Sequence, residues 1–272
     1  MQMTENQLVY LYCVTSEAPK LTETGDSVDN LYFVCHRGLY AVASRVEESE
    51  FGEEGLKKNM ADLEWIKANA STHEKIIEQV MANADVIPFK FATCFNTDDS
   101  LKAMLEEYDE EFKAILRKLE NKEEWGVKIY CDTEKLKGSV INDEPEILKI
   151  ENEINSSPPG KAFFLEKKKA ELLAQSTNAK IIEYSQESFQ LVKELSFEAR
   201  INKLLPKEVT EREDDMVLNS AFLVGEDEVG DFINMVDILK IHYENRGFFI
   251  DCTGPWPPYN FCGLSKQKVR NA

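Results

Sequence analysis

Paired carboxylates, three histidines and six cysteines are the residues of this sequence whose chemistry could support catalysis or metal binding. Acidic pairs occur at Asp98-Asp99, Glu106-Glu107 and Asp214-Asp215. Converging carboxylates can act as acid and base or hold Mg²⁺. The chain has 50 acidic residues against 32 Lys and Arg, however, so acidic neighbours are expected in it anyway. Helix caps, turns and solvated faces therefore explain these pairs better than a site does.

The histidines lack the spacing of a metal or catalytic motif. His73 is not followed by a second histidine four residues later, as a zinc-binding helix requires. It lies on an apolar stripe between Ala70 and Ile77, so packing explains it better than catalysis. His36 belongs to a turn and His242 to a helix, and neither has a recognisable cysteine partner. We predict no catalytic residue and no metal site.

Cysteines and glycines give no sign of a cofactor. The six cysteines lie far apart, mostly within apolar runs, and no Cys-x-x-Cys occurs. Buried free thiols in a reducing compartment explain this pattern better than disulfides or a metal. Both standard glycine-rich phosphate motifs are missing, and Gly52-Glu53-Glu54-Gly55 would oppose a phosphate with two carboxylates. That segment is more typical of a turn before a helix, and we predict no cofactor.

Charge and hydropathy limit the partners that we expect. The formal net charge is −18 at pH 7, which would repel nucleic acid and anionic lipid head groups. The apolar runs stay below the roughly 20 residues that a membrane-spanning helix needs. Residues 1–7 lack the charged and apolar regions of a signal peptide. We expect a soluble, cytoplasmic protein that binds neither nucleic acid nor membrane.

The first half of the chain has the pattern of a mixed α+β domain. Strands are predicted over residues 8–14, 31–35, 39–46 and 86–95, and amphipathic helices over 56–80 and 101–119. A tight turn at Arg37-Gly38 joins two of the strands, and Thr97 supplies an N-cap for the second helix. We predict that this domain covers residues 1–121.

The second half has a different order of elements. Strands are predicted over residues 125–131, 205–213, 216–224 and 248–253, and helices over 145–156, 162–204 (one or two) and 229–243. The order strand, helix, strand, strand, helix, strand is typical of a ferredoxin-like unit, here with an enlarged helical first crossover. We predict a C-terminal domain of residues 122–272 that ends in an extended tail.

The tail, Gly254 to Phe261 (GPWPPYNF), combines three prolines with three aromatic residues. The prolines exclude a helix or a central strand, and Trp256, Tyr259 and Phe261 need burial or a partner. Two interpretations are open. The tail folds back over its own domain, or it extends the preceding strand and presents the aromatic residues to another protein.

Together these segments resemble the gas vesicle accessory protein F/L family. The similar runs, which span Leu8 to Phe261, are LVYLYCV, ADLEWIKANASTHEKII, VIPFKFATCF, EEWGVKIYCD and TGPWPPYNF. The last run is the most specific. One departure is visible, because this family tends to have arginine and glycine where this chain has Lys90 and Ala92.

The resemblance implies a two-domain α+β protein, with a C-terminal ferredoxin-like domain, that is required for gas vesicle assembly and binds the small hydrophobic shell protein. It implies no catalytic residues. We expect a non-enzymatic, minor structural or assembly factor that contacts the shell protein and other accessory proteins through strand edges and apolar patches. Trp256, Tyr259 and Phe261 are the expected contact residues. The alternative is a small-molecule-binding or enzymatic ferredoxin-like protein, which a deep polar pocket with converging Glu, His73 and Tyr groups would favour.

Overall fold

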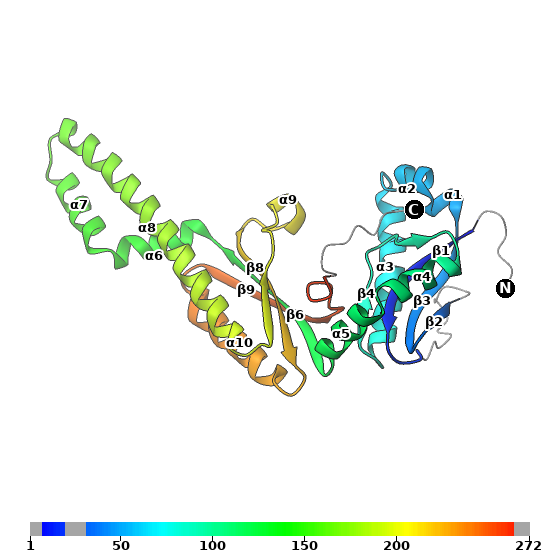
Figure 1. Ribbon diagram of the computed structural model, residues 1–272. Coiled ribbons are helices and arrows are strands. Elements are labelled where there is room, and N and C mark those ends of the chain that lie inside the picture. Colours follow the sequence, from blue (N-terminus) through cyan, green and yellow to red (C-terminus); the bar gives the residue numbers. More distant parts are fainter. Residues whose placement is uncertain (1–6, 20–30, 264–272) are drawn as a thin grey trace. The chain divides into compact units, whose positions relative to one another are not determined.

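The computed structural model describes residues 7–19 and 31–263, which form parts of two compact units (Figure 1). Of the described residues, the first unit comprises those up to Glu123 and residues 255–263. The second unit is Glu124–Gly254. The predicted division had placed the tail with the second domain, whereas the structure groups it with the first, because its side chains pack there. Independent folding of the two halves stays a prediction.

The sheet of the first unit is built around two long strands. Its strands are β1 (Gln7–Thr15), β2 (Tyr32–His36), β3 (Leu39–Glu47), β4 (Val86–Pro88) and β5 (Cys94–Phe95). The order is β2-β3-β1-β4, and β5 also pairs with β1; each of these pairs is antiparallel. Arg37 and Gly38 both have positive φ, which gives the predicted tight turn between β2 and β3.

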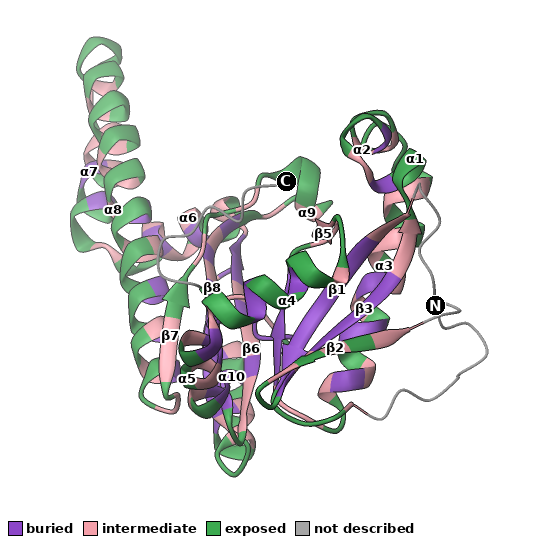
Figure 2. Cartoon of the chain, turned by 45° about the vertical axis from the view of Figure 1, so that its right-hand side comes forward, coloured by how far each residue is buried: buried purple, intermediate pink, exposed green. Residues whose placement is uncertain are grey.

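Helices pack on this sheet, and its central strand β1 is buried on both faces, whereas β2 keeps exposed residues. The helices are α1 (Glu48–Phe51), α2 (Glu53–Asn59), α3 (Leu63–Met81), α4 (Asp98–Glu107) and α5 (Asp109–Leu119). Successive residues from Val9 to Thr15 are buried whichever face they point to (Figure 2). This explains why the run LVYLYCV is continuously apolar rather than alternating.

Two helices predicted as continuous are each divided in two. The apolar stripe from Leu56 to Val80 crosses a break at Asp62, whose side chain accepts from the backbone N–H groups of Glu64 and Trp65 and so starts α3. The second stripe crosses a break at Tyr108, whose backbone ends α4 and begins α5. An apolar stripe persists across such a break because both helices face the same core.

The predicted strand over residues 86–95 was wrong in its middle. Only Val86–Pro88 and Cys94–Phe95 pair as strands. Between them, Ala92 has a φ of 63°, and its N–H donates to the Tyr10 hydroxyl over 2.9 Å. This left-handed conformation turns the chain out of the ladder. Ala92 is one of the two residues at which the sequence departs from the pattern of the family that it resembles.

The second unit has a four-stranded sheet in the order β7-β8-β6-β9. In chain order, its elements are β6 (Lys122–Cys131), α6 (Thr133–Asp143), α7 (Pro145–Asn155), α8 (Pro159–Lys193), β7 (Glu198–Ile201), α9 (Lys207–Thr210), β8 (Asp215–Gly225), α10 (Val229–Glu244) and β9 (Phe248–Trp256). Helices α8 and α10 meet on the sheet, where Phe222 of β8 contacts Phe189 and Phe232. The fold of the chain is thus mixed α+β with two sheets.

The local predictions for this unit were wrong in two places and missed one helix. The strand expected over 205–213 is instead the short helix α9, which follows Pro206, and the strand lies earlier as β7. Of the one or two helices left open over 162–204 there is one, α8, since 175–178 contains no glycine or proline to end it. It ends at Lys193, so the predicted helical region was too long, and β7 occupies part of the remainder. Helix α6 was not predicted; Asp132 caps its start by accepting from the Lys135 N–H.

The positive φ of Ala92 leads to a test of stability. We expect Ala92→Gly to stabilise the first unit by about 1 kcal/mol, because glycine adopts a left-handed backbone without the steric cost of a Cβ. Ala114→Gly, at an exposed position within α5, is the matched control and should cost about 1 kcal/mol. Hydrogen exchange of the slowest amides of β1 measures both effects. Equal losses in the two variants would refute a backbone constraint at residue 92.

Candidate functional site

A buried polar cluster in the first unit is centred on His73 of α3. His73 is 1% exposed, and its Nδ1 lies 3.0 Å from the Tyr10 hydroxyl of β1. Its Nε2 lies 3.0 Å from the Phe89 carbonyl and 3.2 Å from the hydroxyl of Tyr259 in the tail. Tyr259 in turn donates to Glu74 over 2.9 Å. Residues from a strand, a helix, a loop and the tail therefore meet at one histidine.

The hydrogen bonds around His73 define its tautomer. The Phe89 carbonyl can only accept, so Nε2 carries the proton and donates to it. Nδ1 then accepts from the Tyr10 hydroxyl, whose oxygen accepts from the Ala92 N–H. Both ring nitrogens of His73 are satisfied within the protein, which confirms that this histidine is packed.

Burial sets the protonation of this cluster. It lowers the pKa of His73 to about 4, and the bond to the Phe89 carbonyl opposes this only in part. Burial also raises the pKa of Tyr10, Tyr259 and Glu74. At neutral pH the imidazole is uncharged and both phenols keep their protons. A Glu, a His and Tyr groups do converge here, but as a packed network that fastens the tail to α3.

The three aromatic residues of the tail have different environments. Phe261 is 2% exposed, and the Lys118 ammonium of α5 lies 5.6 Å from its ring centroid. Tyr259 is half-buried, whereas Trp256 is 45% exposed. Tyr259 and Phe261 therefore pack against the protein itself, on the first unit, as one of the two interpretations of the tail expected of its aromatic residues. A partner contact at Trp256 stays a prediction.

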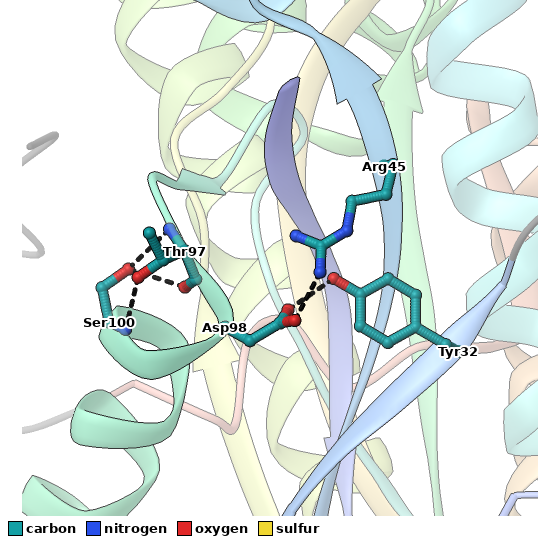
Figure 3. Close-up of polar contacts among 5 residues, drawn as sticks. All are labelled: Tyr32, Arg45, Thr97, Asp98 and Ser100. Atoms are coloured by element: carbon teal, nitrogen blue, oxygen red, sulfur yellow. Dashed lines mark hydrogen bonds and ion pairs between the residues drawn. The ribbon is translucent and has the colours of Figure 1, made fainter. Parts of the chain in front are cut away.

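A second polar cluster joins the sheet to the start of α4 (Figure 3). Asp98, the first residue of α4, forms an ion pair with Arg45 of β3 and accepts from the Tyr32 hydroxyl of β2 over 2.7 Å. The Arg45 guanidinium lies 4.8 Å from the centroid of the Tyr32 ring. Thr97 and Ser100 cap the helix reciprocally, each bonding the other's backbone N–H over 3.1 Å. The predicted cap is confirmed.

The other acidic pairs also have structural roles. Asp214 lies 3.3 Å from Arg212, and Asp215 lies 3.2 Å from Lys207. Glu107 accepts from the Tyr108 hydroxyl. Within residues 7–19 and 31–263, no cluster of His, Cys, Asp or Glu side chains could hold a metal ion, and no helix is long and apolar enough to cross a membrane.

Cysteines and cavities add no assembled reactive site to the described part of the chain. All six cysteines are free, as predicted, but only Cys13, Cys131 and Cys262 are buried, and Cys35 is exposed. A cavity of 360 Å³ in the second unit is lined by residues that include Arg212, Lys240 and Asp251. The cation of Arg212 is already paired with Asp251 over 3.3 Å.

Replacing Asp98 tests the second cluster. We expect Asp98→Asn to cost roughly 2–4 kcal/mol, because it leaves the Arg45 guanidinium, which is 10% exposed, without its carboxylate. Asp99→Asn, in the same helical turn but exposed, should cost less than about 1 kcal/mol. Urea unfolding compares the two variants. A loss at Asp99 as large as that at Asp98 would mean that the helix dipole, and not the ion pair, is the source.

The neutral state of His73 predicts a pH dependence of stability. Its folded pKa of about 4 lies below the ordinary value near 6.5, so between these values the unfolded chain binds a proton that the folded chain does not. The contribution is therefore fully present above pH 6.5 and is lost as the pH falls toward 4, by roughly 2–3 kcal/mol.

Comparison with His73→Gln isolates this effect. The raised pKa of Glu74 has the opposite effect on the unfolding free energy as the pH falls, since the folded chain takes up that proton first. Glu74 is present in both the native chain and His73→Gln, so its effect cancels in the comparison. We expect the difference in unfolding free energy between the native chain and His73→Gln to shrink from pH 7 to pH 4. A difference independent of pH would contradict a neutral, buried histidine.

Known proteins match the chain over nearly its whole length. The family described as gas vesicle synthesis protein GvpL/GvpF matches residues 8–263. Gas vesicle protein L of Streptomyces sp. (strain CB03234) is 24% identical over 98% of this chain and 97% of its own length. Gas vesicle protein L1 of Halobacterium salinarum is 26% identical over 93% of this chain and 89% of its own.

Solved structures of the same family have this fold. The crystal structure of GvpF from Anabaena sp. PCC7120 superposes with a TM-score of 0.72 at 18% identity, covering 96% of this chain and 100% of that one. GvpF from Microcystis aeruginosa superposes with a TM-score of 0.66 at 17% identity, covering 94% and 99%. The resemblance seen in the sequence is confirmed, and the chain belongs to the gas vesicle synthesis protein GvpL/GvpF family.

Proposed function

We propose that this protein is a non-enzymatic factor of gas vesicle assembly that binds the small hydrophobic shell protein and other gas vesicle proteins. The observation that carries the proposal is the match of the GvpL/GvpF family over residues 8–263. Relatives of both names, L and F, match the chain. The protein then acts at the gas vesicle, through surfaces that bind other proteins.

The hairpin of α7 and α8 is the surface that we assign to the shell protein. It extends away from the sheet of its own unit (Figure 1). Phe163 and Phe164 near its tip are 65% and 73% exposed, and their ring centroids lie 5.9 Å apart. Adjacent exposed aromatic side chains are typical of sites that bind proteins, because they leave apolar area in water until a partner covers it.

The charge around these two rings suits an apolar partner. From Pro145 to Glu171, which covers α7 and the start of α8, five Glu side chains are balanced by five Lys side chains, in a chain whose total is −18. Lys168 and Lys169 lie near Glu146 and Glu151 of α7. A locally neutral surface reduces the electrostatic cost of burying the two rings against another protein.

We further propose that Trp256 is a second contact point. The prolines on either side of Trp256 limit the freedom that its backbone would lose on binding. Tyr259 and Phe261 anchor the segment to the first unit, so the indole is presented from a fixed base.

We also infer that the second unit is ferredoxin-like. Its order of elements is β6, the helices α6 to α8, β7, β8, α10 and β9, and its strand order is β7-β8-β6-β9. Both orders are those of a split βαβ unit whose first crossover is enlarged. In this description the α7–α8 hairpin is the enlargement, an addition to a common scaffold that carries its own function.

Binding to the shell protein tests this proposal. We expect the double variant Phe163→Ser/Phe164→Ser to bind co-expressed shell protein about tenfold more weakly or worse, because central aromatic contacts carry most of the affinity of an interface. Trp256→Ala should weaken binding to a smaller extent. Ile182→Ser, an exposed apolar residue farther along α8, is the matched control and should bind normally.

Two readouts separate the outcomes. Co-purification gives the affinity, and the number and shape of vesicles in cells that carry each variant gives the function. Normal vesicles in cells from which the gene is deleted would refute the assembly role. Normal vesicles with the double Phe variant would refute the hairpin as the contact.

A further inference from the structure

Strand β7 forms one edge of the sheet in the second unit, and its sequence is complementary to itself. β7 pairs with β8 on one side, and among the described residues no strand pairs with its other side. Phe197, directly before the strand, is 62% exposed, and Ile201 at its end is 64% exposed. Exposed strand edges with apolar side chains pair readily with further strands.

The register with β8 shows which backbone groups face outward. Ile201 pairs with Ser220 and Arg200 with Ala221, and the Asn202 N–H donates to the Asn219 carbonyl over 2.7 Å. Because backbone groups alternate along an antiparallel strand, those of Arg200 face β8. Those of Ala199 and Ile201 therefore point to the open edge.

We propose that two copies of this chain associate through their β7 strands, antiparallel, about a two-fold axis at Ala199. In this register the Ala199 residues exchange backbone hydrogen bonds, Glu198 of each copy lies opposite Arg200 of the other, and Phe197 lies opposite Ile201. Opposite charges and apolar pairs in such positions stabilise a sheet. Glu198 and Arg200 now pair with each other along the strand, over 2.9 Å, so both side chains are positioned at the edge.

The sequence selects this register over its neighbours. Moving the axis by one residue, to Glu198 or Arg200, shifts the pairing by two residues and places like charges opposite each other, which is destabilising. Placing the axis between two residues, and not at a residue, would join opposite faces of the two sheets. A two-fold contact of this kind closes on itself and gives a dimer rather than a fibre.

The contact is small and each copy is acidic, so we expect a weak dimer. The strand has four residues, which puts the interface at the small end of specific contacts. The charge of −18 on each copy opposes association, but salt near 0.15 M screens it beyond about 8 Å. Sedimentation equilibrium from about 1 to about 100 μM covers the range in which such interfaces dissociate.

Charge reversal is the decisive experiment. Arg200→Glu and Glu198→Arg should each weaken the dimer roughly tenfold or more, because each places like charges opposite each other twice. The double variant Glu198→Arg/Arg200→Glu exchanges the charges and should restore the native affinity. Arg117→Glu, the same charge change on an exposed face of α5, is the control and should leave association unchanged.

A backbone variant gives independent proof. Ala199→Pro removes an outward N–H that β8 does not use, so the monomer should stay folded by circular dichroism while the dimer is lost. A native chain that is monomeric throughout this range overturns the proposal and leaves the edge for another protein's strand. A dimer that Arg200→Glu does not weaken, or that the double variant does not restore, overturns it as well.

Discussion

A histidine buried in an apolar core must stay neutral and must find a partner for each ring nitrogen, and much of the first unit follows from this requirement at His73. Its partners come from Tyr10 on β1 and from the carbonyl of Phe89, just after β4. The Tyr10 hydroxyl needs a donor of its own, and the N–H of Ala92 supplies it. The loop between β4 and β5 therefore leaves the ladder where it does because a buried polar group would otherwise be unpaired, at a cost of about 1–3 kcal/mol.

The tail belongs to the same arrangement. Tyr259 contacts both His73 and Glu74, and the Lys118 ammonium lies over the ring of Phe261. The last described segment therefore completes the first unit after the chain has passed through the second. Gly254, the first residue of the tail, lies at a position where a side chain does not fit. Its ideal Cβ would lie 2.9 Å from the Trp125 ring and 3.0 Å from the Glu124 carbonyl. In the tail, the glycine is required by close packing around its backbone, whereas Tyr259 and Phe261 are required for contacts of their side chains.

How far the sequence predicts this structure depends on how local each determinant is. The long strands and helices were predictable because their patterns repeat within a few residues, and the cap at Thr97 because it lies three residues from Ser100. The breaks at Asp62 and Tyr108 were missed, since one apolar stripe runs through both halves. Strand β7 was missed because four residues at the end of a helical pattern carry no period of their own. The pairing of His73 with Tyr259 joins residues 186 apart. The sequence shows that the side chains of His73 and Tyr259 each need a polar partner. Nothing in the sequence indicates that these two residues contact each other.

The two units use their apolar residues in opposite ways. In the first, aromatic rings turn inward and surround His73, with the centroids of Tyr10, Tyr12 and Phe91 5.6–5.9 Å from the imidazole. In the second, most large apolar side chains that remain exposed gather at the α7–α8 hairpin, along the β7 edge and on α10. Exposed apolar surface lowers solubility and adds a risk of aggregation. The exposed apolar side chains of the hairpin and of the β7 edge, together with Trp256 of the tail, are therefore the surfaces that the proposed partners would cover.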